Sequence, residues 1–431
     1  MGANIAGKHA LAFIFITVLI DSIGLGIILP ILPKLISTLA HTGLDEAAGI
    51  GAWLIFAYAG MQFLFAPLLG SLSDRFGRRP ILILSLAGIA VDYTIMGLAP
   101  TIVWLFVGRT LAGMAGASYT TAAAYIADIT PGEKRAQSFG LIGAGFGVGF
   151  VLGPALGGLI GEYGIRLPFF ASAGLAAANA LYGLLVLKES LPRENRRDFQ
   201  LWRANPLGAL LALRRFPVVL PLCGVLVLMR IAHDANPAVW SYYTMFKFHW
   251  TPTQVGTSLM AIGAIVTVSY MVLPRLIVRI GETRAVYIGL TGGAAAFAGY
   301  AFATQSWMLY AWMAPFALMA LVMPSITAIM SKEVGPTEQG ELQGATTSIG
   351  SLTSVGAPLL MGHLFAHFAD PAADIHFPGA AFAAAALFLV LAGVLFALIN
   401  PARHTGAALQ NAKARLPGSA LVGIRERKRN Q

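Results

Sequence analysis

The stretch Gly70-Ser-Leu-Ser-Asp74-Arg75-Phe-Gly77-Arg78-Arg79-Pro80 is a short charged loop between two long apolar segments. It holds one aspartate and three arginines in a chain in which only 11% of the residues are charged and 57% are hydrophobic. Soluble proteins carry about 25% charged residues, so this chain has too few charges to cover a water-soluble surface. We therefore expect the segments on both sides of the loop to lie in a lipid bilayer.

Apolar segments of similar length recur along the whole chain. Each is close to the length of about 20 residues that a helix needs to cross a bilayer. The predicted spans are 9–31, 49–71, 80–98, 102–125, 139–161, 167–187, 216–238, 254–277, 284–303, 306–330, 341–364 and 377–399. The sequence therefore predicts an all-α membrane protein with twelve transmembrane helices. Its one cysteine, Cys223, excludes a disulfide framework, and no Cys and His spacing is typical of a metal site.

Basic residues are concentrated on one side of the predicted membrane. Most of the 29 lysines and arginines fall in the loops on that side, whereas Lys34, Arg166 and Lys247 fall on the other. By the positive-inside rule, both termini are expected in the cytoplasm. This topology explains the net charge of +10 better than nucleic-acid binding does, so no nucleic acid is expected as a partner.

An internal repeat relates the two halves of the chain. A shift of 204 residues places Gly140, Pro154 and Gly158 on Gly344, Pro358 and Gly362. We predict two pseudo-symmetric six-helix bundles, at 1–187 and 216–400, joined by a cytoplasmic linker at 188–215 and followed by a disordered cytoplasmic tail at 401–431. Such repeats place a substrate cavity at their interface, near the middle of the bilayer.

The charged loop resembles the cytoplasmic signature loop of the major facilitator superfamily, Gly-x-x-x-Asp-Arg-x-Gly-Arg-Arg. The resemblance implies that the loop is part of a latch that holds one conformation shut, formed by Gly70, Asp74, Arg75, Gly77, Arg78, Arg79 and Asp128. It also implies that Arg78 pairs with Asp128 and that Asp74 faces the positive end of the helix dipole near Gly340. The alternative is that the loop is basic only to fix the topology.

A second motif lies in the fifth predicted span and consists of Gly140, Gly149, Gly153, Pro154, Gly157 and Gly158. It matches a pattern that is associated, within the superfamily, with exporters that work by antiport. The alternative is ordinary close packing of helices through small residues. The segments 21–30, 85–93 and 108–113, together with Gln62 and 342–344, are similar to the tetracycline/H⁺ antiporters among the twelve-span drug exporters.

In the first half of the chain, the charged residues Asp21, Asp92 and Arg109 fall well inside predicted spans. Each costs about 2.5–3.5 kcal/mol at the centre of a membrane helix, so a water-filled path is the default hypothesis. We interpret Asp21 and Asp92 as proton-coupling or substrate-binding acids, with Arg109 as the charge that modulates them. The alternative is a buried structural hydrogen bond.

Other polar and aromatic residues of the spans are candidates for the substrate cavity or for packing. The cavity candidates are Tyr58, Gln62, Tyr93, His233, Asn236 and Trp240. Arg230 and Asp234 lie on one helical face beside His233, either as an ion pair at the outer mouth or as a second titrating site.

Two positions differ from the tetracycline exporters. Gly293 aligns with a functional acid of those exporters, and an apolar residue near Ile265 aligns with a histidine. These departures weaken the case for tetracycline itself as the substrate. Asp234 is our candidate to replace the missing acid, so it joins the proton-coupling residues.

The sequence predicts a proton-coupled antiporter, rather than an enzyme, that exports small amphipathic or drug-like molecules by alternating access. The alternatives are a metabolite symporter or facilitator of the same fold, and a receptor or scaffold that does not transport. No ATP-binding loop is present, so the expected energy source is the proton gradient, with no cofactor and a divalent cation only if it travels with the substrate. The expected partners are the substrate, protons and membrane lipid, and the chain is expected to be a monomer.

Overall fold

The computed structural model describes residues 2–116, 118–130, 135–196, 218–335 and 338–399. Every regular element within these ranges is a helix, which agrees with the prediction of an all-α membrane protein. Most of the predicted linker and the whole predicted tail lie outside the described residues.

The helices form two groups that follow each other in the sequence. The first group contains α1 (Gly2–Ile28), α2 (Leu32–Ala40), α3 (Leu44–Phe76), α4 (Arg78–Leu98), α5 (Ile102–Ala115), α6 (Ser118–Ile129), α7 (Arg135–Tyr163) and α8 (Leu167–Val186), and a short 3₁₀ turn, η2 (Arg193–Asn195), follows it. The second group contains α10 (Val219–Phe248), α11 (Pro252–Ile280), α12 (Glu282–Phe302), α13 (Ser306–Ala317), the 3₁₀ turn η5 (Leu318–Leu321), α14 (Val322–Glu333), α15 (Gln339–Ala369) and α16 (Ala380–Ile399).

Eleven helical stretches of the described residues are long and apolar enough to cross a bilayer, with α13, η5 and α14 counted together as one. The fourth predicted span, 102–125, is present but is not one continuous helix, because α5 ends at Ala115 and α6 begins at Ser118. At this break the side-chain Nε2 of Gln62 donates a hydrogen bond of 2.9 Å to the Gly116 carbonyl oxygen. A carbonyl that leaves the helix inside a membrane needs such a partner.

The predicted repeat is visible in the backbone. Gly77 and Gly281, which the 204-residue shift relates, both have positive φ angles, of 107° and 82°. Each separates two consecutive helices at the same place in its group. The same shift places Gly116, at the break after α5, on Ala320 within η5. Both groups therefore interrupt their fourth span at the same point.

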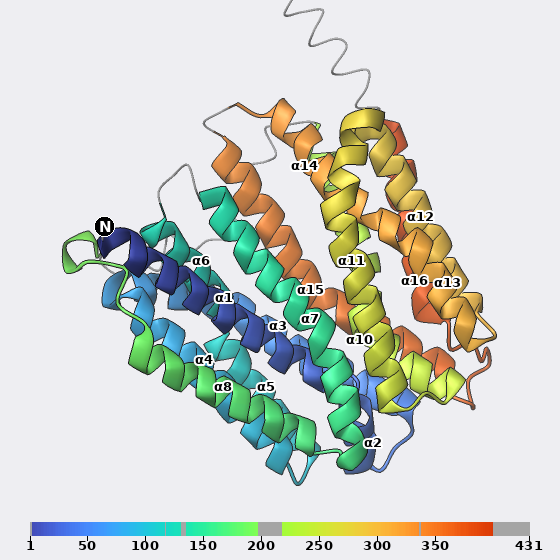
Figure 1. The fold of residues 1–431 in the computed structure, drawn as a ribbon. Helices are drawn as coiled ribbons and strands as arrows, with labels where there is room; N and C mark the ends of the chain where they lie inside the picture. Colours follow the sequence, from blue (N-terminus) through green and yellow to red (C-terminus); the bar gives the residue numbers. More distant parts are fainter. Residues whose placement is uncertain (1, 117, 131–134, 197–217, 336–337, 400–431) are drawn as a thin grey trace, which may run out of the picture.

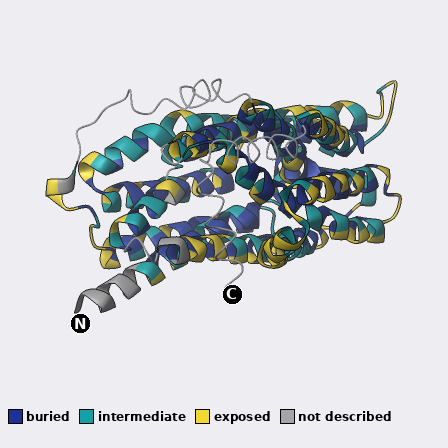
Figure 2. Cartoon of the chain, turned by 90° about the horizontal axis from the view of Figure 1, so that it is seen from above, coloured by how far each residue is buried: buried dark blue, intermediate teal, exposed yellow. Residues whose placement is uncertain are grey.

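The outer surfaces of the two groups are apolar. Large exposed side chains such as Leu64, Val103, Leu185 and Leu398 lie on different helices and are more than half exposed. Figure 2 shows exposed residues along the outward sides of the helices and buried residues between them. This is the pattern of a bundle whose solvent is lipid.

The two groups contact each other chiefly through α7 with α11 and through α3 with α15. Figure 1 shows them close together near α2 and apart at the end where the chain begins. We call the end that carries Arg75, Arg78 and Arg79 the basic end, and the end that carries Glu162 and Thr253 the opposite end.

The opposite end is closed by close contacts of repeat-related glycines. A Cβ atom at Gly158 would lie 2.6 Å from the Pro252 carbonyl oxygen, and one at Gly362 would lie 3.2 Å from the Ala48 carbonyl oxygen. Thr253 Oγ1 also donates a hydrogen bond of 2.5 Å to Glu162 Oε1 across the two groups. At the basic end no atom lies within 4 Å of the corresponding position at Gly140, so the groups diverge there.

Candidate functional site

A cavity of about 540 Å³ lies between the two groups of helices, and residues from both groups line it. Its charged lining residues are Asp21, Asp92 and Arg109 from the first group and Asp234 from the second. The four residues predicted to couple protons therefore face one shared space, although they are spread over more than 200 positions of the sequence.

Asp92 and Arg109 form a buried ion pair. Asp92 is fully buried and Arg109 is 9% exposed. Arg109 donates to both carboxylate oxygens of Asp92, with 3.3 Å between Nε and Oδ1. The guanidinium also lies over the rings of Tyr58 and Tyr93, at 5.4 and 5.7 Å from their centroids. The charge of Asp92 is thus balanced by a partner that two aromatic faces stabilise in turn.

A glycine brings the two helices of this pair together. A Cβ atom at Gly108 would lie 2.7 Å from Asp92 Oδ1. Because Gly108 has no side chain, α5 lies close enough to α4 for the next residue, Arg109, to reach the carboxylate. Gly108 was predicted only as part of a motif, and the structure shows what its small size achieves.

Asp21 lies on α1, is half-buried, and lines the same cavity. Its carboxylate interacts electrostatically with the hydroxyls of Tyr58 and Tyr93. The same two tyrosines are therefore near both Asp21 and the guanidinium of Arg109. We find Asp21 in a different environment from Asp92, because its side chain is not fully enclosed by protein.

Polar contacts with α8 fix the position of α1 on either side of Asp21, and the sequence analysis missed them. Asn179 Nδ2 donates to the Thr17 carbonyl oxygen at 3.1 Å, and Thr17 Oγ1 donates to Asn179 Oδ1 at 3.2 Å. One turn beyond Asp21, Ser172 Oγ donates to the Gly24 carbonyl oxygen at 3.1 Å. An asparagine inside an apolar span was the signal that could have revealed this attachment.

The cavity candidates divide into three sets. Tyr58, Gln62 and Tyr93 line the main cavity as predicted. His233 instead lines a second cavity of about 210 Å³. Asn236 and Trp240 line neither of these two cavities, and both are buried in the second group.

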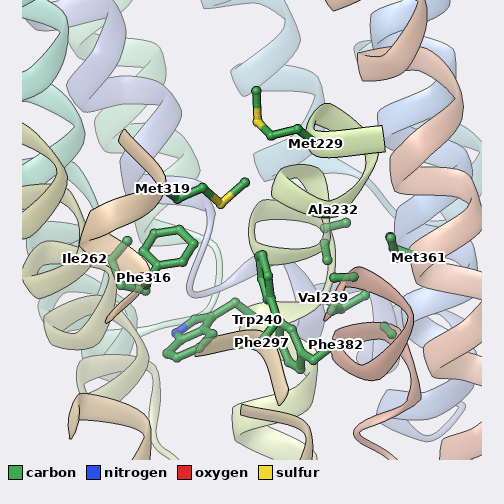
Figure 3. Packing of buried hydrophobic residues seen from close by; sticks show 14 of the residues in the cluster. Met229, Ala232, Val239, Trp240, Ile262, Phe297, Phe316, Met319, Met361 and Phe382 are labelled. Carbon is green, nitrogen blue, oxygen red and sulfur yellow. The ribbon is translucent and has the colours of Figure 1, made fainter. Parts of the chain in front are cut away.

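Trp240 is a core residue, which corrects the prediction that it lines the cavity. It is 1% exposed, and its Nε1 donates to Ser258 Oγ at 2.9 Å. Its ring packs edge-on against Tyr300. It also packs edge-on against Phe382 (Figure 3). Asn236 lies one helical turn away on the same face of α10, which explains why it too is directed into the core.

In the cluster on α10, Arg230 and Asp234 do not form the ion pair that was one of the two interpretations of this cluster. Asp234 Oδ1 lies 3.4 Å from Nδ1 of its neighbour His233. Asp234 faces the main cavity, whereas Arg230 and His233 face the second cavity. The three side chains therefore separate the two cavities.

Gly293 lies in a packed region that has no room for an acid. A Cβ atom there would lie 2.9 Å from Leu389 Cδ1 and 3.3 Å from Met319 Sδ. Apolar side chains fill the space that the acid of the tetracycline exporters was expected to need. The residues around position 293 are therefore suited to the glycine that this chain has there, and not to an acidic side chain.

The predicted latch loop is organised around Arg78. Arg78 forms ion pairs with Asp74 and with Asp128, the latter at 3.2 Å between Nε and Oδ2. The expected pairing with Asp128 is therefore present. Asp74 is 41% exposed, and among the described residues it pairs with Arg78 rather than with the start of α15.

The turn at Gly77 also receives a carboxylate from beyond α8. Glu189 accepts hydrogen bonds from the backbone N–H groups of Arg78 at 2.8 Å and Arg79 at 3.3 Å. A carboxylate at the start of α4 satisfies N–H groups that have no helical partner and favours the helix dipole. The Glu189 carboxylate occupies the space that a side chain at position 77 would need.

Except for Gly140, the glycines of the second motif lie at two helix contacts. Positions 149, 153 and 157 face α1, where Cβ atoms at 149 and 153 would meet the backbone of residues 19 and 23 at 2.7 Å. Gly158 faces α11 instead, as described above. Pro154 lies inside α7, and a Cβ atom at Gly26 would lie 2.7 Å from its Cδ.

None of the described residues forms a group of three or more His, Cys, Asp or Glu side chains that could hold a metal ion. A charged cavity between two repeated groups of membrane-spanning helices is the arrangement of a multi-pass membrane transporter.

Comparisons with known proteins agree with this class. The chain matches the Major Facilitator Superfamily over residues 14–233 and again over residues 222–431. It is 39% identical to the tetracycline resistance protein, class C, of Escherichia coli over 83% of this chain and 90% of that protein. It is 30% identical to multidrug resistance protein 2 of Bacillus subtilis (strain 168) over 83% of this chain and 87% of that protein.

A solved structure with a similar fold is that of the nucleoside transporter NupG. It has a TM-score of 0.73 and 15% sequence identity, and the match covers 90% of this chain and 98% of that one. The chain belongs to the Major Facilitator Superfamily. The predicted fold of twelve transmembrane helices in two pseudo-symmetric bundles is thereby confirmed.

Proposed function

We propose that this protein exports small amphipathic, drug-like molecules across the bacterial cytoplasmic membrane in exchange for protons. The observation that carries the proposal is the main cavity, because both bundles line it and it contains Asp21, Asp234 and the Asp92–Arg109 pair. The similarity to tetracycline and multidrug resistance proteins supports a drug-like substrate.

The size and lining of the cavity support this class of substrate. A volume of about 540 Å³ falls within the range of about 300–1,000 Å³ that is typical of sites for drug-sized ligands. Apolar residues such as Leu25, Ile55 and Phe146 line the cavity together with its acids. The apolar part of an amphipathic molecule would contact these residues, and its polar or cationic part would contact the acids.

We assign the proton-carrying role to Asp21 and a supporting role to the Asp92–Arg109 pair. Asp92 is fully buried and neutralised by Arg109, so it is poorly placed to exchange a proton in this conformation. Asp21 is half-buried at the cavity wall and exchanges protons with whichever side the cavity faces. Charged residues at this depth are costly and mark ion paths in membrane proteins.

The direction of opening follows from the distribution of basic residues. By the positive-inside rule the basic end, and with it both termini, faces the cytoplasm. The bundles diverge at that end and contact each other at the opposite end. On this orientation, the structure is an inward-open conformation that accepts substrate from the cytoplasm.

The proposal also includes the proton gradient as the energy source and the monomer as the working unit. A divalent cation takes part only if it travels with the substrate.

The test uses inside-out membrane vesicles whose lumen has been acidified. Exporters in such vesicles move substrate into the lumen and protons out of it, so adding tetracycline or ethidium should raise the luminal pH, measured with a pH-sensitive dye. Asp21→Asn should abolish this response without changing the amount of protein in the membrane, and Asp21→Glu should retain part of it.

Two results would contradict the proposal. One is an undiminished pH response in the Asp21→Asn vesicles. The other is substrate entry at the same rate with and without the proton gradient, which would identify a facilitator.

A further inference from the structure

The second cavity, of about 210 Å³, lies within the C-terminal bundle. Side chains of α10, α11, α13, η5 and α14 line it. Those that matter for its chemistry are Met229, Arg230, His233, Phe316, Met319 and Met323. His233 and its neighbour Asp234 are in contact and face different cavities, so the second cavity lies next to the main one.

The internal repeat relates this cavity to the N-terminal wall of the main cavity. That wall includes Leu25, Gln62, Ala112 and Gly116. The 204-residue shift places these residues on Met229, Val266, Phe316 and Ala320, and all four line the second cavity. The two walls are therefore equivalent surfaces of the two bundles, and the chemistry of the second differs because its residues differ.

Arg230 supplies a charge that the rest of the described structure leaves unpaired. It lies 11 residues after Val219, the start of α10, which corresponds to a depth of about 16 Å. No described residue forms a hydrogen bond or ion pair with its guanidinium, because Asp234 pairs with His233 instead. On the other side, Gly350 has no side chain to cover it, and a Cβ there would lie 3.9 Å from Arg230 Cζ.

A guanidinium at this depth is costly unless an anion pairs with it. Arginine at the centre of a membrane helix is unfavourable and faces cavities or partners when it occurs. Its planar fork binds a carboxylate through two parallel hydrogen bonds. The missing partner of Arg230 is therefore best supplied by a ligand that carries a carboxylate or a similar anion.

The rest of the lining is suited to an aromatic ring. Phe316 and Met319 approach the cavity from one side of α10, and Met229 extends from α10 itself (Figure 3). Methionine side chains adapt their shape to a ligand, and their sulfur atoms make favourable contacts with aromatic rings. Three methionines and a phenylalanine beside one arginine thus form a site that is apolar at the walls and cationic at one point.

We propose that this cavity is a subsite for an anionic aromatic group of the transported molecule, with Arg230 binding the anion and Met229, Phe316 and Met319 contacting the ring. This assignment rests on the proposed function, since the ligand is part of the exported molecule. At about 210 Å³ the cavity is smaller than a complete drug site, so it accepts one part of the molecule. The remainder lies in the main cavity, where the acids favour a cationic group.

The experiment measures the charge preference of the cavity directly. The full chain carries Cys223→Ala to remove its one cysteine, and Ala320→Cys to place a reactive thiol in the second cavity. Anionic sulfonatoethyl and cationic trimethylammonioethyl methanethiosulfonates are compared as labelling reagents. The added variant Arg230→Gln should slow labelling by the anionic reagent about tenfold, with no such loss for the cationic one. Arg230→Lys should keep the anionic preference.

A second measurement tests occupancy by the aromatic anion. 1-Naphthoate should protect Ala320→Cys from labelling, 1-naphthylmethylamine should not, and Arg230→Gln should remove the protection. Ala59→Cys, in the main cavity, is the matched control and should not be protected by 1-naphthoate. Equal labelling by both reagents in the presence and absence of Arg230, or protection that survives Arg230→Gln, would overturn the proposal.

These measurements need neither a proton gradient nor transport. A loss of the luminal pH response would therefore contradict the proposed export while leaving the labelling result intact. A failure of the labelling and protection tests would remove the subsite while leaving proton-coupled export in place.

Discussion

At the scale of single residues, the acids of the main cavity differ in how far the protein encloses them. Asp92 is enclosed and bound to Arg109, whereas Asp21 lies half-buried at the cavity wall. The sequence predicts that both acids lie at mid-membrane, but it does not distinguish them. The difference depends on the contact between α4 and α5 that Gly108 allows.

We expect Asp92→Asn and Arg109→Gln each to destabilise the protein by about 3 kcal/mol, because each leaves one buried charge without its partner. The double variant should regain most of this stability, since neither charge remains. Thermal unfolding of the purified chain in detergent measures the coupling as a double-mutant cycle. If the effects of the two single changes simply add, the two side chains do not act as a pair.

The two residues that were predicted to line the cavity but lie in the core belong to the same helix. Trp240 and Asn236 lie on α10, and a helix turns a different face to the core, to the cavity and to lipid. The helices that pack around α10 decide which of its faces is directed to the core, which to the cavity and which to lipid. These helices are distant from α10 in the sequence. By contrast, the pairing of Arg78 with Asp128 was predicted because the family resemblance of the charged loop implies it.

At the scale of secondary-structure elements, the spans were predictable because charged residues are excluded from lipid and mark the helix ends. The break between α5 and α6 was not predictable from the apolar pattern, which continues through it. It depends on Gln62, which lies 54 positions away and satisfies the Gly116 carbonyl. The matching interruption at η5 shows that the break belongs to the repeated unit.

The close contact of α7 with α11 leads to a prediction about closure. Gly158→Val adds a side chain where a Cβ would already lie 2.6 Å from the Pro252 carbonyl oxygen. We expect this variant to hold the opposite end open and to lower the rate of export at least about tenfold. A cysteine introduced at Thr253, in the Cys223→Ala background, should then react faster with a membrane-impermeant thiol reagent added outside whole cells.

The matched control for this prediction is Gly174→Val on α8. Position 174 is exposed, and nothing lies within 4 Å of its Cβ position. It should therefore leave both export and thiol labelling unchanged. If Gly158→Val and Gly174→Val have equal effects, steric contact between the bundles is not the cause.

At the scale of the whole molecule, alternating access requires the opposite end to separate when the basic end closes. We expect that joining Glu162→Cys to Thr253→Cys by a disulfide, in the Cys223→Ala background, stops transport, because these side chains lie in contact across the bundles. Reduction should restore transport, measured in the same vesicles before and after the reductant. Continued transport by the oxidised protein would show that the two bundles need not separate at this point.

The attachment of Glu189 to the turn at Gly77 has a mechanical consequence. The covalent connection from the first bundle to the second leaves the first bundle at a point held by the backbone of Arg78 and Arg79, and Ser190 adds a hydrogen bond of 3.1 Å to Asp128. The related turn at Gly281 has no atom against its Cβ position. Among the described residues, the segment that follows the first bundle is thus anchored to one of two repeat-related turns, so the duplicated halves are not mechanically equivalent at their basic ends.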